Sequence, residues 1–241
     1  MARAGGAGLG AMGGMVAEPV ARVRSLTDRA HDMLRRAIIT CQMPPGLEIS
    51  EQDLAERLEM SKTPVREALA RLALAGLVEA FPRRGYRVTP VTVRDVNDLF
   101  VVRGALEGTA AELAASRMDA ADLDALEGLA EATYVPGEAP SRTAFVEANA
   151  AFHTAIARGS GVERLAGLVV AHLEEATRLF HMGAHYRDVN PETTAEHRQI
   201  VEILRGRDPA RAREALMRHN ETTRRGLLNA LVADPQSGLS L

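Results

Sequence analysis

Three histidines and one asparagine are the residues of this sequence that could most clearly do chemistry together. Asn149 and His153 are four residues apart in a predicted helix, where both fall on the apolar face. His197 and His219 lie on the apolar faces of two later predicted helices. One amide oxygen and three imidazoles, held on three helices, form a donor set for a Zn, Ni, Mn or Fe ion.

The spacing of His197 and His219 indicates that their two rings can meet. The midpoint between them lies in an Asp208-Pro209 turn, so in an antiparallel pair each imidazole stands about 11 residues, or ~16 Å, from that turn. The alternative is that each histidine is a hydrogen-bonded core residue, and at this stage both interpretations stay open. His181 and His185 are predicted to lie on the surface or in a loop, because the helical pattern weakens there.

Arg103 lies on a predicted apolar stripe that also contains Leu99, Leu106 and Ala110. An unpaired buried guanidinium is costly, so this side chain needs a partner. The partner is either an internal glutamate or the carboxylate of a small ligand, which arginine binds through two parallel hydrogen bonds.

A second set of polar residues, near the N-terminus, suits nucleic acid. Lys62, Thr63, Arg66 and Arg71 lie at the start of a predicted helix or off its apolar stripe, and the turn 82–85, which contains Arg83 and Arg84, joins two predicted strands. A helix N-terminus with its cations can enter the major groove of duplex DNA, and wing arginines can reach phosphates or the minor groove. A basic solvated surface is the alternative, but the helix-turn-helix spacing together with the basic turn favours DNA binding.

A winged helix-turn-helix is the predicted scaffold of these basic residues. The predicted elements are a helix over 25–40, a helix from Ser50 to about residue 59, a helix from Pro64 to Gly76, and strands over 77–81 and 86–88. Thr63 can cap the third helix, and Pro64 at its first position loses no hydrogen bond.

The rest of the chain predicts an all-helical bundle. Its six helices are expected over 93–117, 119–133, 141–158, 161–183, 191–206 and 209–232, with no strand after residue 92. The fold class is therefore mainly α, a winged helix-turn-helix followed by a helical bundle. The expected organisation is a flexible leader (1–20), a DNA-binding domain (21–89), a linker (90–92), an all-helical domain (93–234) and a flexible tail (235–241).

Composition limits the class of protein. The chain has 241 residues, one cysteine and no apolar run near the ~20 residues that span a membrane, so a soluble cytoplasmic protein without a disulfide framework is expected. Residues 1–92 hold 13 Lys and Arg against 10 Asp and Glu, whereas residues 93–241 hold 16 against 22. A mildly basic front half and an acidic rear half suit a polyanion-binding head on a non-binding body.

Two stretches resemble a known family. Residues 25–90, with the segment PVREALARLALAGLV, resemble the winged-helix domain of GntR-type bacterial transcription regulators. Residues 93–232, with NAAFHTAIARGSG and EHRQIVEILRGRDPARAREALMRH, resemble the FCD-type ligand domain of the FadR subfamily. Six helices rather than seven indicate the VanR-like branch.

The resemblance implies roles for particular residues. It places DNA contacts on Gln52, Lys62, Thr63, Arg66, Arg84 and Gly85, although position 52 is often arginine in relatives. It places metal ligands on Asn149, His153, His197 and His219, with asparagine where relatives have aspartate. It also assigns a ligand carboxylate to Arg103.

The residues and the resemblance together predict a metabolite-responsive transcription regulator. We expect a repressor that binds double-stranded operator DNA as a homodimer on a pseudo-palindromic site, with a small carboxylate effector near a divalent metal. A metal-dependent enzyme built on the Asn/His cluster and a ligand-independent DNA-binding protein are the alternatives. The sequence contains no HExxH, P-loop or dinucleotide fingerprint, which argues against the enzyme.

Overall fold

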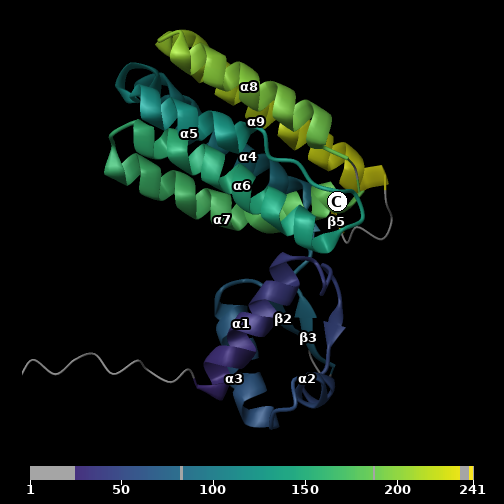
Figure 1. The fold of residues 1–241 in the computed structure, drawn as a ribbon. Coiled ribbons are helices and arrows are strands. Elements are labelled where there is room, and N and C mark those ends of the chain that lie inside the picture. Colours follow the sequence, from purple (N-terminus) through teal and green to yellow (C-terminus); the bar gives the residue numbers. More distant parts are fainter. Residues whose placement is uncertain (1–24, 82–83, 187, 234–238, 241) are drawn as a thin grey trace, which may run out of the picture.

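A winged-helix domain and a larger helical domain make up the protein, joined by one connection (Figure 1). The computed structural model describes residues 25–81, 84–186, 188–233 and 239–240. The predicted leader, the wing residue Arg83 and most of the predicted tail lie outside these residues. The predicted fold class, mainly helical with a small sheet in the front domain, is confirmed.

The winged-helix domain packs three helices against a three-stranded antiparallel sheet. Its elements are α1 (Leu26–Ile39), β1 (Glu48–Ile49), α2 (Glu51–Arg57), α3 (Lys62–Leu74), β2 (Val78–Phe81) and β3 (Gly85–Val88), with the strands in the order β1-β3-β2. The apolar residues that recur at helical spacing, among them Leu34, Leu54 and Leu69, are buried in one core with Val88 of the sheet. This packing leaves the polar faces of α2 and α3 exposed.

Gly85 closes the wing between β2 and β3. It pairs with Phe81 across the hairpin and has a φ of 99°. A Cβ at this position would overlap the backbone oxygen of Ile49 on the neighbouring strand. Because only glycine tolerates both the left-handed backbone and the close approach, the wing is held tightly against β1.

Two details of the predicted winged domain are wrong. The third helix begins at Lys62 with Ser61 at the N-cap, rather than at Pro64 with Thr63 as the cap. Pro64 still loses no hydrogen bond, because the first four N–H groups of a helix have no partner within it. Strand β1 was not predicted, since two residues are too few to show an alternating pattern.

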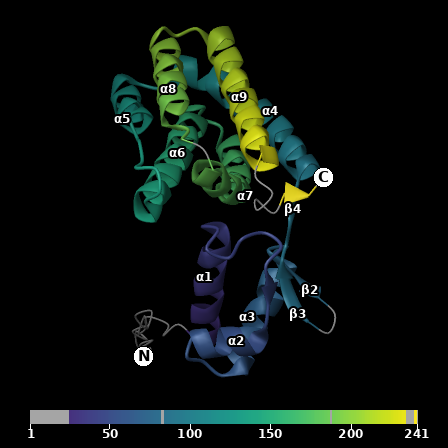
Figure 2. The same ribbon diagram turned by 90° about the vertical axis from the view of Figure 1, so that its right-hand side faces the viewer.

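The larger domain is built around its first helix. In the described residues its helices are α4 (Val93–Arg117), α5 (Ala120–Ala130), α6 (Ala139–Gly159), α7 (Glu163–Tyr186), α8 (Asn190–Arg205) and α9 (Pro209–Ala233), close to the six predicted ranges. Helix α4 packs against α6, α7, α8 and α9, and α8 and α9 run side by side from a tight turn (Figure 2). The side chain of Thr92 accepts a hydrogen bond from the backbone N–H of Asp95, so a capping box starts α4 directly after the linker.

A short strand in the tail contradicts the prediction that no strand follows residue 92. Strand β5 (Leu239–Ser240) pairs in parallel with β4 (Val91–Thr92), which itself lies in the predicted linker. Pairing between segments so far apart in the chain leaves no local pattern, because strand periodicity needs more than two residues.

The two domains meet where α7 passes the end of α1. The buried Arg178 of α7 donates a hydrogen bond from Nη2 to the carbonyl oxygen of Thr89, at 2.8 Å. Cys41 follows the C-cap of α1 with a φ of 58°, and its Sγ lies 3.8 Å from the carbonyl oxygen of Arg178. Since Cys41 also packs against a helical-domain cluster that contains Leu179, both domains contribute to one junction.

The junction predicts slow alkylation of Cys41. Burial raises the pKa of its thiol to about 11, and only the thiolate reacts with iodoacetamide. At pH 7.5 we expect modification of the folded protein to be slower than in 8 M urea by on the order of tenfold or more. Intact-mass measurement over time gives the rate directly, because Cys41 is the only cysteine. Equal rates in the two conditions would contradict the buried junction.

Candidate functional site

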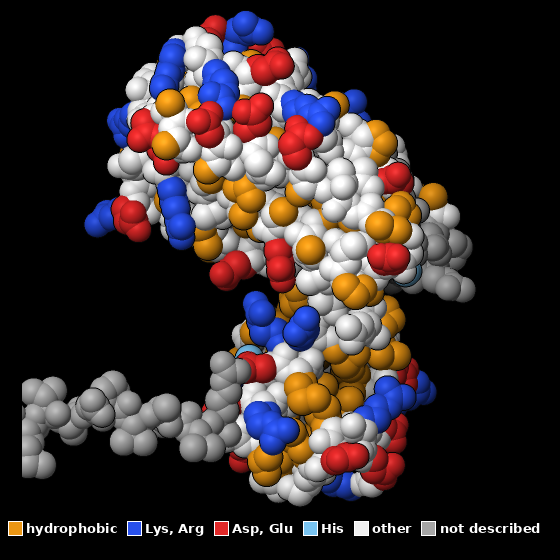
Figure 3. Space-filling view, viewed as in Figure 1, with side chains coloured by type: hydrophobic (Ala, Val, Ile, Leu, Met, Phe, Trp, Pro, Cys, Tyr) orange, Lys and Arg blue, Asp and Glu red, His pale blue; other side chains and the backbone are white. Residues whose placement is uncertain are grey.

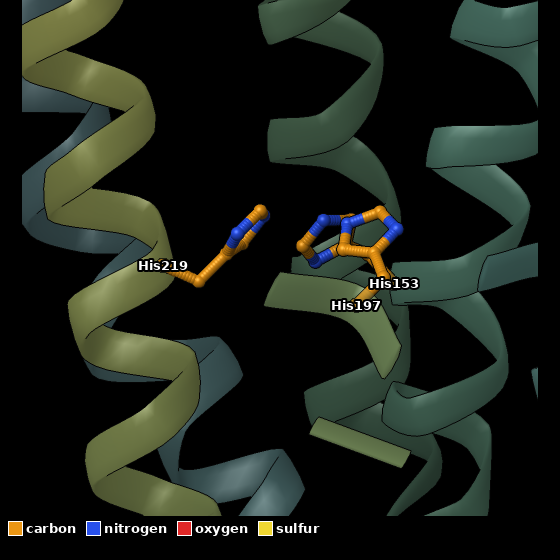
Figure 4. A group of neighbouring side chains, drawn as sticks. All are labelled: His153, His197 and His219. Atoms are coloured by element: carbon orange, nitrogen blue, oxygen red, sulfur yellow. The ribbon is translucent and has the colours of Figure 1, made fainter. Parts of the chain in front are cut away.

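Three buried histidines from three helices converge inside the helical domain. His153 comes from α6, His197 from α8 and His219 from α9, and one ring nitrogen of each lies within 4.8 Å of the others (Figure 4). The ring centroids of His153 and His219 are 5.2 Å apart, and those of His197 and His219 are 4.9 Å apart. The structure thus brings together the rings whose spacing predicted that they meet.

Carboxylates and an aromatic ring orient these imidazoles. Nδ1 of His153 lies 2.5 Å from Oε2 of Glu107, and Nδ1 of His219 lies 2.6 Å from Oε2 of Glu196. The ring of His197 is stacked on Phe152, with centroids 3.9 Å apart. A carboxylate on one ring nitrogen is the usual support of a metal-binding histidine, because it leaves the other nitrogen available to the metal.

Two ring nitrogens are left without partners in this cluster. Nε2 of His153 and Nε2 of His197 are buried, and neither has a hydrogen-bond partner among the described residues, while Nδ1 of His153 has only its ion-pair contact with Glu107. Buried polar atoms without partners are costly. A divalent cation held by the three imidazoles fits this arrangement, since it would satisfy these atoms.

Burial favours the neutral form of His153 and His197. Burial lowers the pKa of His197 well below its ordinary value, and the neighbouring His219 and His153 lower it further. Burial also lowers the pKa of His153, although Glu107 opposes this shift. Burial alone would raise the pKa of Glu107, but the positive charge of Arg103 and the neighbouring His153 ring lower it to about 2. Neutral imidazole is the form that binds metal ions.

A cavity of about 50 Å³ adjoins the histidines. His153, His219 and the nine-tenths buried Asn149 form part of its wall, so the predicted oxygen donor lies in the same cavity as two of the imidazoles. The apolar part of the wall includes Phe145, Val146, Phe180 and Leu227. The volume is several times what one water molecule needs, which is enough for a small ligand.

Arg103 reaches the same cavity from α4. Its Nε donates to Oε1 of Glu107 at 2.7 Å, and its Cζ lies 4.8 Å from the ring centroid of Phe100 and 5.0 Å from that of Phe180. Nη1 is buried without a hydrogen-bond partner in the described residues. Of the two partners that the sequence left open, the internal glutamate is therefore present, and part of the guanidinium still lacks an acceptor.

Several residues of this site escaped prediction. Glu107 follows Arg103 by four residues, a spacing that signals an ion pair on one helix face, but its contact with His153 depends on how α4 and α6 pack.

His181 is buried in α7, whereas a surface or loop position was predicted; α7 continues to Tyr186 and carries it into the core. Burial, together with Arg142, lowers its pKa to about 4.

The residues predicted to contact DNA lie on the exposed ends of α2 and α3 and at the wing. Gln52 and Lys62 line a shallow surface hollow between the two helices, while Thr63 and Arg66 follow in the first turns of α3. Arg84, directly before β3, and Gly85, its first residue, are exposed. They lie later in the sequence than the other four residues but in the same domain. All six residues predicted to contact DNA are exposed.

Acidic residues hold two of these arginines. Arg66 pairs with Glu51, and Arg84 pairs with Glu48 at 3.2 Å. In the view of Figure 3, acidic and basic side chains are interspersed over the helical domain, so its negative charge is not gathered in one patch on this face.

Comparison with known proteins decides the family. The model of the gntR family of bacterial regulatory proteins matches residues 26–88, and that of the FCD domain matches residues 98–222. The chain belongs to the GntR family. It is 31% identical over 196 residues to a probable D-xylose utilization operon transcriptional repressor of Paenarthrobacter nicotinovorans. The alignment covers 81% of this chain and 85% of that protein.

Two further comparisons agree with the GntR assignment. The transcriptional repressor RspR of Escherichia coli K12 is 26% identical to this chain over 195 residues. The alignment covers 80% of this chain and 85% of RspR. The crystal structure of a putative GntR regulator from Rhodococcus sp. RHA1 superimposes with a TM-score of 0.65 at 26% identity. The match covers 85% of this chain and 98% of the Rhodococcus chain. The resemblance inferred from the residues is thereby confirmed.

This GntR-family chain is a transcriptional regulator with a DNA-binding domain and an FCD domain, and not an enzyme. The metal-dependent enzyme that the sequence left as an alternative is therefore excluded. Among the described residues, no helix has the length and apolar character needed to cross a membrane.

Metal analysis tests the histidine cluster. We expect full-length protein incubated with Zn²⁺ and desalted to retain the ion, and His153→Ala with His197→Ala to lose it, because two of three imidazoles are removed. Elemental mass spectrometry measures the metal per chain. His172→Ala is the control, since that histidine lies outside the cluster and its Nδ1 is 2.7 Å from the carbonyl oxygen of Leu168 in its own helix. A wild-type protein without metal, or a double variant that keeps it, would contradict the site.

Proposed function

We propose that this regulator is a metabolite-responsive repressor, in which a small carboxylate binds in the helical domain beside a divalent metal and releases operator DNA. The observation that carries the proposal is that one cavity is lined by Asn149, His153, His219 and Arg103. A metal site and a guanidinium therefore face the same small space.

The ligands of the metal would be His153, His197 and His219, with Asn149 as a neutral oxygen donor. Three imidazoles suit Zn, Ni, Mn or Fe, and a neutral amide in place of a carboxylate leaves more positive charge on the site. When bound, such an ion supplies a Lewis-acidic cation that attracts an anionic ligand. This charge adds to that of Arg103, which lines the same cavity.

The cavity wall supports a small carboxylate as the effector class. The guanidinium of Arg103 has Nη1 without an acceptor, and a carboxylate oxygen would satisfy it. The rings of Phe145 and Phe180 and the side chains of Val146 and Leu227 would contact the carbon skeleton of the ligand. Thr193 and Thr223 add hydroxyl groups that can bond a polar substituent.

Helix α7 supports a route from the effector to the DNA-binding domain. Phe180, Gly183 and Ala184 line the cavity, and Arg178 on the same helix donates to the carbonyl oxygen of Thr89 in the connection between the domains. A ligand that binds two positions of α7 with different affinity would shift the position of the winged domain and thereby operator affinity.

The proposed active species is a homodimer on a pseudo-palindromic operator, acting in the cytoplasm where bacterial DNA lies. One winged domain contacts too few base pairs for useful specificity, and two winged domains contact twice as many. Val101, Val102 and Ala105 form an exposed apolar strip on α4, which supports a contact between two copies. A ligand-independent DNA-binding protein is the competing function, and effector binding distinguishes the two.

Operator binding tests the predicted DNA face. A promoter fragment from beside the gene should be bound by the full-length protein, and Arg66→Ala should weaken binding by about tenfold or more, because a base-contacting arginine contributes ~1–3 kcal/mol. Fluorescence anisotropy at fixed salt measures the affinity. Arg218→Ala removes the same charge from the exposed face of α9 and should bind as wild type does. Equal weakening in both variants would assign the effect to net charge alone.

A screen of small carboxylic acids tests the effector. We expect at least one acid to raise the melting temperature of wild-type protein and lower its operator affinity, and Arg103→Lys to abolish both responses, since lysine cannot make the paired hydrogen bonds. Lysine is preferred to alanine because an unpaired, buried Glu107 would cost ~3–5 kcal/mol of stability. Arg213→Lys, at the surface between α9 and α4, is the control. An acid that stabilises both variants equally would contradict a role for Arg103.

A further inference from the structure

A cleft lies between the two domains, beside their junction. Its volume is about 540 Å³, and residues of both domains and of the connection between them line it. Figure 3 shows that the molecule is hollowed between its domains. The volume is in the range of small-molecule sites, which often form where two domains meet. The cavity beside the histidines is lined by a different set of residues, so the two spaces are separate.

Arg178 brings a buried positive charge to the wall of this cleft. The residue is 7% exposed. Of its five N–H donors one is used in the described residues, by the bond from Nη2 to the carbonyl oxygen of Thr89, while Nε is buried without a partner. Burial lowers the pKa of Arg178. Because a buried guanidinium without an anion destabilises the folded protein, this position suits an anionic ligand.

The acidic residues of the cleft wall do not neutralise Arg178. Glu174 and Glu175 stand one turn earlier on α7, but both are exposed, and within the described ranges neither forms an ion pair with Arg178. Asp95 is engaged in the capping box with Thr92 at the start of α4. Unlike the arginine of the effector cavity, Arg178 therefore has no carboxylate partner in the part of the chain that the structure describes.

A second arginine adds to the positive potential at the junction. Burial raises the pKa of the Cys41 thiol, and the charges of Arg178 and Arg142 both oppose this shift, so both guanidinium groups lie near the same sulfur. Nε of Arg142, in the first turn of α6, is buried without a hydrogen-bond partner among the described residues. Two cations thus lie close together where no acidic side chain of the described chain is paired with either.

The composition of the wall indicates the class of ligand. A single compact anionic group can reach Arg178, whereas the exposed carboxylates of Glu174 and Glu175 would repel a ligand with several negative charges. The rest of the ligand would lie against apolar side chains, which reduces its exposed apolar surface. These side chains come from both domains and from the connection: Ile39, Leu77, Pro90, Leu99 and Leu179.

We propose that the cleft between the domains is a second ligand site, which binds an organic monoanion through Arg178 and holds its apolar body against the surrounding walls. The site is distinct from the histidine cavity and uses neither the metal nor Arg103. Because the ligand contacts both domains, its affinity depends on their relative position, and binding favours one arrangement of the two.

A fluorescent monoanion tests the site. The probe is 8-anilinonaphthalene-1-sulfonate, whose emission rises in apolar surroundings. Full-length protein should bind it saturably at fixed salt, and benzoate should displace it, whereas benzyl alcohol, with the same ring but no charge, should not. Arg178→Gln keeps N–H donors for Thr89 but removes the charge. It should weaken benzoate binding by about tenfold or more, because hydrogen bonds to charged groups are roughly that strong.

A second variant blocks the cleft without changing Arg178. Ala171 lines the cleft from an exposed position on α7, so Ala171→Trp places an indole in the space that the ligand needs. It should abolish the fluorescence that benzoate displaces. Ala125→Trp, at an exposed position of α5, is the matched control and should bind the probe as wild type does. Circular dichroism melts establish that each variant is folded.

Arg103→Lys separates this inference from the proposed function. It should leave probe binding unchanged, because Arg103 lies in the other cavity. Loss of the probe in folded Arg103→Lys but not in Arg178→Gln would assign binding to the histidine cavity, and would overturn the inference while the proposed effector site stands. Benzoate-sensitive binding that is equal in wild type, Arg178→Gln and Ala171→Trp, or no binding by wild type, overturns it as well.

Discussion

One buried carboxylate connects the guanidinium and the imidazoles of the proposed effector site. Glu107 lies between Nε of Arg103 and Nδ1 of His153, and all three side chains are almost completely buried. A buried carboxylate without partners destabilises the folded protein. Buried Arg103 and His153 would likewise be destabilising without the carboxylate. The three must therefore stay together, which fixes the guanidinium of Arg103 relative to the imidazole of His153 in the wall of the cavity.

Close packing of α4 against its neighbours makes this contact possible. Gly108 follows Glu107 directly, and a Cβ there would lie 2.8 Å from Cγ of Met217 on α9. Small residues at Ala111, Ala114 and Ala115 continue the same packing along α4. Because α4 starts immediately after the linker, the helix that carries Arg103 and Glu107 is also the one through which the winged domain is attached.

Among the described residues, the junction between the domains has few polar contacts, and this suits a regulator. Arg178 and Thr89 form one hydrogen bond, and Cys41 packs beside them. A small interface costs little to rearrange, so modest differences in ligand affinity can change its geometry. By contrast, the predicted DNA-binding face is held within the winged domain by the ion pair between Glu51 and Arg66. The sequence-reading surface can thus stay constant while the relative position of the two domains changes.

Local patterns in the sequence determined the elements and the faces of this protein. Apolar spacing predicted α4 from Val93 to Arg117, and the Asp208-Pro209 turn predicted that His197 and His219 stand level, because helix geometry depends only on neighbouring residues. Only the tertiary structure decided that Glu107 contacts His153, that His181 is buried, that β5 pairs with β4 and that Glu51 holds Arg66. Each of these depends on how separate elements pack, and the distance between two elements is set by all the side chains between them, not by either stretch of sequence alone.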